Sequence, residues 1–321
     1  MDLKPMHAFD STHTDLILMC KDVPVYDVST EIVLNELLLP GCMRKFPCNH
    51  TFKEWAEQRY AESSNSIAKK LREYFRQKTQ TEIDMETGAF SLSDCYWLKI
   101  KGSTKCFEQV SPYFADFWKG MGEWRGQAIP SLYVGGALDK YWDNQWDLIK
   151  IGKSVRREIL AIQLCKAAGI SCCSIEETAE GICVKNFTNS NQMLEQADAS
   201  GRLDSEDFTD VDIVGIFGEK GMEMLVVDAI TANTDRHAGN FGFLRDSNTG
   251  DYLGMAPLYD FDQILQSKYP NDVLMQDLMQ VVKQFPVYRE RAIRIAEMAV
   301  TSNLHPVFSE RAKVLMNALR E

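Results

Sequence analysis

The sequence predicts an α+β protein with two lobes, a mixed N-terminal lobe that carries a β-sheet and a helical C-terminal lobe. Short strand-like runs such as DLILM, YWLKI and DLIKI recur before Phe187. After Asp260 three amphipathic segments follow one another, NDVLMQDLMQVVKQF, YRERAIRIAEMAV and PVFSERAKVLMNAL. A chain of 321 residues is long enough for two such lobes.

The composition is that of an ordinary globular protein, with 45% apolar and 25% charged residues. The net charge of −11 argues against a nucleic-acid-binding protein, because the surface that contacts nucleic acid is usually basic. It leaves room for a local basic groove. No apolar run is long enough for a membrane span, and the first residues, MDLKPMHAFD, are not expected to form a signal peptide.

The nine cysteines are scattered along the chain, without a repeating CxxC pattern. An odd number of cysteines without a secretory signal is typical of reduced thiols, so we expect a cytoplasmic protein. Cys42, Cys48 and His50 lie close together in GCMRKFPCNH, but a fourth zinc ligand at a standard spacing is missing. We therefore interpret these cysteines as buried structural residues.

Individual elements are expected as follows. DLILMCKDVPVYDV, residues 15–28, has two apolar runs on either side of a polar pair and predicts a hairpin. Helices are expected over 51–60 and 67–76, and a strand within SLSDCYWLKIKGS. Residues 188–210 are polar and are interpreted as a surface loop, whereas 222–232 is an apolar helix that leads into the next segment.

The segment from Ala232 to Asp260 holds three oxygen-bearing side chains, Asp235, Asn240 and Asp260. Two apolar runs flank the turn cluster SNTGD and predict a β-hairpin, with Gly250 midway between Asn240 and Asp260. Folding the hairpin at this turn would bring Asn240 and Asp260 together, one loop away from Asp235. Magnesium favours such oxygen ligands. The alternative is a plain loop, because Asp, Asn and Gly are also ordinary turn residues.

A second candidate group lies in LYVGGALDKYWDNQWDLIKIGKSVRREIL. Gly135 and Gly136 predict a loop whose backbone amides could approach phosphates closely. Lys150 lies in a strand, and Glu158 opens the following helix. This order matches the lysine–glutamate pair of protein kinases, in which the lysine binds nucleotide phosphates and the glutamate orients it. The alternative is an exposed edge-strand lysine, with Glu158 interacting only with the helix dipole.

The string NTDRHAGNFGF followed by APLYD closely resembles the catalytic segment of HipA-like serine/threonine kinases. These are bacterial, often toxin-related, and distantly related in fold to eukaryotic protein kinases and phosphoinositide kinases. The resemblance implies that Asp235 is the catalytic base and that Asn240 and Asp260 hold magnesium. Gly239 stands where some members carry a lysine, so a phosphate contact from that position is not implied.

Two further strings extend the resemblance. VGGALDK resembles the GGARPK-type loop of the family, and LIK resembles its nucleotide-binding lysine strand. The resemblance implies that Gly135 and Gly136 form the phosphate loop, that Lys150 contacts phosphate and that Lys140 is a loop residue. ICVKNF falls at the hinge between the lobes, which places Phe187 beside the adenine.

The resemblance covers roughly residues 131–265 and implies a two-lobed kinase-like fold. The expected division is an N-terminal extension over 1–90, an N-lobe with the nucleotide-binding sheet over 91–187, and a helical C-lobe with the catalytic loop and metal site over 188–321. The expected reaction is transfer of the γ-phosphoryl group of ATP, with Mg²⁺, to a serine or threonine hydroxyl of a protein.

Two other functions remain open. One is a kinase-fold enzyme that acts on a lipid or small molecule, although the sequence has no obvious basic membrane-facing patch. The other is a non-catalytic nucleotide-binding module, such as a toxin-like subunit held by a small antitoxin-like partner.

Some family members are inhibited by phosphorylation of a serine at the start of the glycine loop, but Tyr133 occupies that position here.

Overall fold

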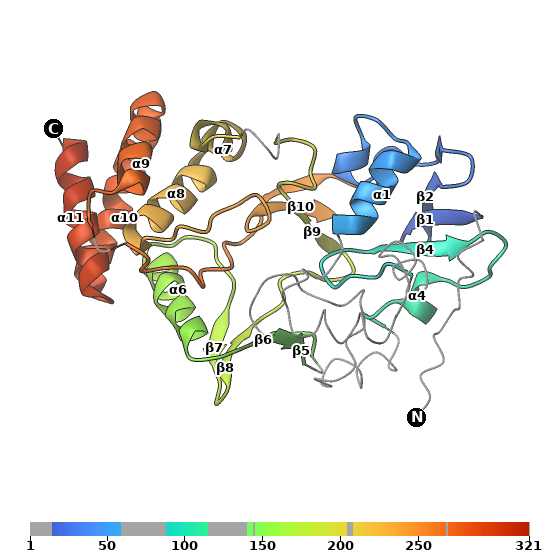
Figure 1. Ribbon diagram of the computed structural model, residues 1–321, viewed down its shortest axis with the longest axis horizontal. Helices are drawn as coiled ribbons and strands as arrows, with labels where there is room; N and C mark the ends of the chain where they lie inside the picture. The colour runs from blue at the N-terminus through green and yellow to red at the C-terminus, as the bar shows by residue number, and fades with distance from the viewer. Residues whose placement is uncertain are drawn as a thin grey trace.

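The computed structural model describes residues 15–58, 88–114, 140–143, 145–203, 208–267 and 269–320. These residues form three antiparallel sheets and a set of helices. Figure 1 shows the first strands of the chain at one end of the molecule and its last three helices at the other, with two sheets between them. The predicted α+β class is confirmed.

The sheet at the N-terminal end joins segments that are far apart in the sequence. Its order is β3-β2-β1-β4, with β1 at Leu16–Cys20, β2 at Val23–Asp27, β3 at Ile32–Val33 and β4 at Tyr96–Ile100. The hairpin expected over 15–28 is confirmed, and so is the strand in SLSDCYWLKIKGS. Because β1 pairs with β4, one sheet combines residues of the expected N-terminal extension and of the expected N-lobe.

Short helices complete this part of the molecule, namely η1 (Gly41–Met43), α1 (Asn49–Gln58) and α4 (Phe107–Val110). The expected helix over 51–60 therefore begins two residues earlier, and the one expected over 67–76 lies outside the described residues. Aromatic side chains from α1 and the sheet pack against one another in a shared core. Cys42, within η1, and Cys48, just before α1, are half-buried and not fully buried as expected.

A second sheet, in the middle of the molecule, has the order β5-β6-β8-β7. Its strands are β5 (Lys140–Trp142), β6 (Leu148–Ile151), β7 (Ile175–Glu177) and β8 (Gly181–Val184). After β6 the chain makes a single turn, η4 (Ser154–Arg157), and enters α6 (Glu158–Ala167), as the sequence predicts. Gly169 follows the end of α6 with φ +67°, a left-handed conformation that glycine adopts without strain.

A third sheet, β11-β10-β9, contains the predicted hairpin. It consists of β9 (Gln192–Gln196), β10 (Gly242–Asp246) and β11 (Tyr252–Met255), and Gly250 turns between the last two with φ +78°. The expectation of a surface loop over 188–210 is therefore wrong. β9 is too short and polar to stand out in the sequence, and its pairing with β10 fixes it as a strand.

Helices form the rest of the molecule. They are α7 (Asp210–Phe217), α8 (Glu219–Thr231), α9 (Val273–Gln284), α10 (Arg289–Ser302) and α11 (Pro306–Arg320). α8 is buried along almost its whole length, because α7, α9, α10 and α11 all pack against it. The three amphipathic segments are thus confirmed as helices. In the described part of the chain, no helix has the length and apolar character that a membrane crossing requires.

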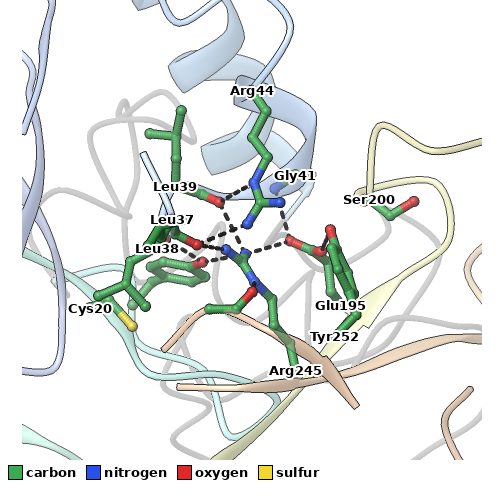
Figure 2. Close-up of polar contacts among 12 residues, drawn as sticks. Cys20, Leu37, Leu38, Leu39, Gly41, Arg44, Glu195, Ser200, Arg245 and Tyr252 are labelled. Carbon is green, nitrogen blue, oxygen red and sulfur yellow. Dashed lines mark hydrogen bonds and ion pairs between the residues drawn. The ribbon is translucent and has the colours of Figure 1, made fainter. Parts of the chain in front are cut away.

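Arg245 on β10 joins the N-terminal part of the chain to the third sheet (Figure 2). Its side chain is fully buried and pairs with Glu195 on β9 at 3.1 Å. The guanidinium also donates to the hydroxyl of Tyr96 and to three backbone carbonyls, those of Leu37, Leu39 and Gly250. Glu195 in turn accepts from the backbone N–H of Gly41 at 2.8 Å and from the Tyr252 hydroxyl at 2.5 Å.

Candidate active site

Lys150 lies at the centre of a largely buried polar group formed by β6 of the middle sheet, α6 and the segment after β11. Its ammonium is 2.7 Å from Glu158 Oε1 and 2.6 Å from Asp260 Oδ1. Lys150 is in β6, flanked by β5 and β8, and only 4% of it is exposed. The alternative of an exposed edge-strand lysine, with Glu158 free to serve only the helix dipole, is therefore wrong.

Charge complementarity controls the ionisation of this group. Burial alone would lower the pKa of Lys150, but the adjacent Asp260 and Glu158 carboxylates hold it above its usual value. Burial would raise the pKa of Asp260, yet Lys150 and Lys140 keep it well below the ordinary range. For Glu158 burial outweighs the attraction of Lys150, and its pKa is raised. The Lys150–Asp260 pair is therefore ionised at neutral pH.

Lys140 is a second lysine of this group that the sequence analysis placed in a loop. It lies in β5, in register with Lys150 on β6, and is 8% exposed. Burial lowers its pKa, and the attraction of Asp260 opposes this only in part. Its ammonium has no hydrogen bond or ion pair with any of the described residues. Lys140 and Lys150 are each five residues from Gln145, which lies between the two strands. This equal spacing is the sequence signal that could have predicted that the two lysines face each other across a hairpin.

The loop that follows α8 carries Asp235 and Asn240. α8 ends at Thr231, and Ala232 takes a left-handed conformation with φ +53° that turns the chain out of the helix. Asp235 is exposed, whereas Asn240 is 6% exposed. The Asn240 side-chain amide donates from Nδ2 to the Asp235 carbonyl at 2.9 Å. This bond commits the nitrogen, so Oδ1 is the atom of Asn240 that can bind a cation.

Asp260 reaches the same region from the far end of the hairpin. Arg236 Nη1 donates to the Asn240 carbonyl at 2.7 Å and to the carbonyl of Tyr259, the residue before Asp260, at 3.0 Å. The hairpin therefore brings the two segments together, as the turn at Gly250 led us to expect. Asp260 itself has φ +58°, a conformation that non-glycine residues rarely adopt and that is enriched at functional sites.

The end of β9, which the sequence analysis missed, supports this loop. The backbone N–H of Ala197 donates to the carbonyls of Ala238 and Phe241, both at 3.0 Å. Gln196 Nε2 donates to the Gly239 carbonyl at 2.6 Å. All the acceptors are backbone carbonyls and two of the three bonds are donated by a backbone N–H, so residue types in the sequence do not predict this contact.

The remaining expected residues are placed as follows. Phe187 lies beyond the end of β8 and packs its ring 5.7 Å from that of Tyr259, so it borders the segment that carries Asp260. Gly135, Gly136 and Tyr133 lie outside the described residues. Their expected roles stay predictions.

Comparison with known proteins bears on the fold. No protein-family model matches the chain. The structure is similar to that of HipA from Shewanella oneidensis MR-1, solved in a toxin–antitoxin complex with HipB and operator DNA. The TM-score is 0.59, and the match covers 95% of this chain and 96% of that one at 13% identity. The chain has the HipA fold.

A short stretch of the chain is also similar in sequence to a curated protein. The serine/threonine-protein kinase CtkA of Helicobacter pylori is 42% identical over 59 residues, which is 18% of this chain and 17% of that protein. The solved structure of the H. pylori proinflammatory kinase CtkA covers 57% of this chain and 90% of that one, with a TM-score of 0.39 and 16% identity. The predicted kinase-like α+β architecture is thus confirmed by the HipA fold.

Proposed function

We propose that the protein is an ATP-dependent kinase of the HipA type, which transfers the γ-phosphoryl group to a serine or threonine hydroxyl of a protein. The observation that carries the proposal is the position of Lys150, within 2.7 Å of Glu158 and 2.6 Å of Asp260. The strand lysine and helix glutamate are in contact as in protein kinases, and the aspartate follows them in the same order as the metal-binding aspartate of those enzymes.

The two lysines would receive the phosphates of ATP. Lys150 is held in place by Glu158, and Lys140 lies beside it with its charge uncompensated by a direct partner among the described residues. A buried ammonium without a partner is unfavourable, and a polyphosphate would remove that cost. The amides of Gly135 and Gly136 would cover the phosphates, and Phe187 would border the adenine.

The residues present fit a magnesium ion. Asn240 offers Oδ1, since its Nδ2 is committed to Asp235, and Asp260 offers an ionised carboxylate. Oxygen atoms of this kind are the ligands that magnesium prefers, together with phosphate oxygens of the nucleotide. When bound, the ion would neutralise charge on the β- and γ-phosphates.

Asp235 would act as the base. Its carboxylate is exposed, so a protein hydroxyl can reach it, and its backbone is held by Asn233 and by the Asn240 amide. The side chain would accept the proton of the attacking hydroxyl while Lys140 and Lys150 hold the transferred group. Most of the catalysis would then come from positioning and charge stabilisation.

The experiment is phosphoryl transfer from ATP labelled at the γ-position, with magnesium, in the parent chain, Lys150→Met and Asp235→Asn. Label on serine or threonine of an added protein, lost in both variants, supports the proposal. Label found only in lipid or small-molecule acceptors would replace it with the first alternative. Magnesium-dependent ATP binding without transfer to any acceptor would leave a nucleotide-binding module.

A partner and a location are also proposed. The S. oneidensis HipA was solved with HipB and operator DNA, so we propose a small antitoxin-like partner for this chain. All nine cysteines are free, which fits a reducing cytoplasm. Affinity purification of the tagged chain from its own cells, with any bound small protein identified by mass spectrometry, tests the partner.

A further inference from the structure

Asp228 is a buried carboxylate on α8 that no part of the proposed reaction uses. It is 3% exposed and faces Arg236 in a two-pronged pair, with Nε 2.8 Å from Oδ2 and Nη2 3.0 Å from Oδ1. Asn233 Nδ2 also donates to Asp228 Oδ1, at 2.8 Å. One carboxylate thus accepts three hydrogen bonds from the loop that follows its own helix.

The partners of Asp228 continue into the candidate active site. Arg236 Nη1 bridges two backbone segments, donating to the carbonyls of Asn240 at 2.7 Å and of Tyr259 at 3.0 Å. Asn233 Oδ1 accepts the backbone N–H of Asp235 at 3.4 Å. Asp228 therefore fixes, through Arg236 and Asn233, the peptide groups that carry or adjoin Asp235, Asn240 and Asp260.

Metal binding makes this arrangement consequential. Magnesium demands near-ideal octahedral geometry with ligands at about 2.0–2.1 Å, so displacement of one ligand by a fraction of an ångström weakens binding. Asn240 and Asp260 come from opposite ends of a hairpin, and Arg236 is the side chain that bonds to the backbone on both sides. Partners that orient metal ligands typically change metal affinity about 10- to 100-fold when they are mutated.

We propose that Asp228 is a positioning residue, which uses Arg236 to hold the segments of Asn240 and Asp260 at the separation that magnesium requires. The inference rests on the proposed function, because it assigns Asn240 and Asp260 as ligands. Asp228 touches neither metal nor nucleotide. Its effect is to set the relative position of the two loops before magnesium and ATP bind.

The chain contains a matched control for this pair. Arg311 on α11 is 1% exposed and also forms a two-pronged contact with Asp272, here through its two Nη atoms, with both Nη–Oδ distances at 2.8 Å. Arg311 likewise donates to two backbone carbonyls, those of Ala229 and Tyr269. In both pairs a buried arginine side chain binds one carboxylate and two backbone carbonyls, although the Asp272 side chain is 18% exposed and that of Asp228 is 5% exposed. They differ in that the Arg311 pair holds no backbone next to Asn240 or Asp260.

The experiment compares Asp228→Asn with Asp272→Asn in the full chain. ATP binding is measured by calorimetry at a series of magnesium concentrations, and hydrogen–deuterium exchange is followed in peptides that cover 233–242 and 256–263. We expect Asp228→Asn to raise the magnesium concentration needed for half-maximal ATP affinity by about 10-fold or more, and to speed exchange in both peptides. Asp272→Asn should leave the magnesium midpoint and both peptides unchanged.

A second pair of variants serves if Asp228→Asn fails to fold. If Asp228→Asn does not fold, Arg236→Lys is compared with Arg311→Lys, because lysine keeps the charge but cannot reach the carboxylate and two carbonyls together. A folded Asp228→Asn or Arg236→Lys with the parent's magnesium midpoint, or with faster exchange in one peptide alone, would overturn the inference. A parent chain that binds ATP without any dependence on magnesium would instead overturn the proposed function and the inference with it.

Discussion

The ammonium of Lys150 lies 2.6 Å from the carboxylate of Asp260, although 110 residues separate them in the chain. β6 of the middle sheet supplies the lysine, and the segment after β11 supplies the aspartate. The contact joins the two segments of the candidate site directly. It also makes the stability of the fold depend on the ionisation of the site.

Lys150→Met should destabilise the protein in a pH-dependent way. The variant leaves the buried Glu158 carboxylate, and the partly exposed Asp260, without Lys150, and breaking a buried pair in this way costs about 3–5 kcal/mol at neutral pH. Without Lys150 the folded-state pKa values of both carboxyls rise. A group whose pKa is higher in the folded state than in the unfolded state stabilises the fold at pH values below its unfolded-state pKa. This stabilisation is lost as the pH rises through its folded-state pKa. In urea titrations, the loss of unfolding free energy relative to the parent should therefore be larger at pH 7.5 than at pH 5. An equal loss at both pH values would contradict an ionised Lys150–Asp260 pair.

Lys140→Met should have opposite effects on stability and binding. The parent buries an ammonium whose pKa is lowered by burial, so methionine, which carries no charge, should leave the free energy of unfolding equal or higher. ATP affinity should fall by about tenfold or more, since hydrogen bonds to charged groups contribute about 1.5–3 kcal/mol. Urea denaturation and ATP titration measure the two effects. A variant that binds ATP as the parent does would remove Lys140 from the phosphate site.

Asp235→Asn should separate chemistry from binding. The exposed position of Asp235 predicts little change in stability, and asparagine keeps the local shape. Magnesium–ATP should still bind, while phosphoryl transfer at saturating ATP falls by about 10²–10⁴ because the positioned base is gone. Transfer at the parent rate by the folded variant would show that Asp235 is not the base.

Asp260→Asn should act on the metal instead. The variant removes the negative charge of one of the two proposed ligands and the ion pair of that residue with Lys150, so a higher magnesium concentration should be needed for ATP binding. A magnesium titration of ATP affinity checks this, with Asp262→Asn as a control two residues away. Equal magnesium requirements in Asp260→Asn and the parent would exclude Asp260 as a ligand.

Gly250→Ala tests the contact of the N-terminal segment at Leu37 with the hairpin at Gly250 and Arg245. A Cβ at Gly250 would lie 2.0 Å from the Leu37 carbonyl and 3.2 Å from an Arg245 nitrogen, whereas one at Gly102 would have nothing within 4 Å. Both glycines have φ +78°, so the backbone strain of alanine, about 1–2 kcal/mol, is common to both variants. Gly250→Ala should be less stable than Gly102→Ala by a further ~1–3 kcal/mol from lost buried hydrogen bonds. Equal Tm values for Gly250→Ala and Gly102→Ala would contradict a stabilising contact between Leu37 and the hairpin.

The sequence by itself determined the elements that have a strong local signal. The three C-terminal amphipathic helices, the strand with Lys150 followed by the helix with Glu158, and the hairpin about Gly250 all follow from periodicity and turn residues within one segment. For the same reason the sequence could group Asn240 with Asp260. A tight turn between two short strands leaves one way of closing the hairpin.

The tertiary structure decided what depends on contacts between distant segments. β9 became a strand because β10 pairs with it, and Lys140 became buried because β5 pairs with β6 beside Asp260. Asp228 reads in the sequence as one polar residue of an apolar helix, and its three hydrogen bonds exist only once the chain turns back after Thr231. Local patterns specify helices and turns, whereas pairing, burial and the partners of buried charges are set by the whole fold.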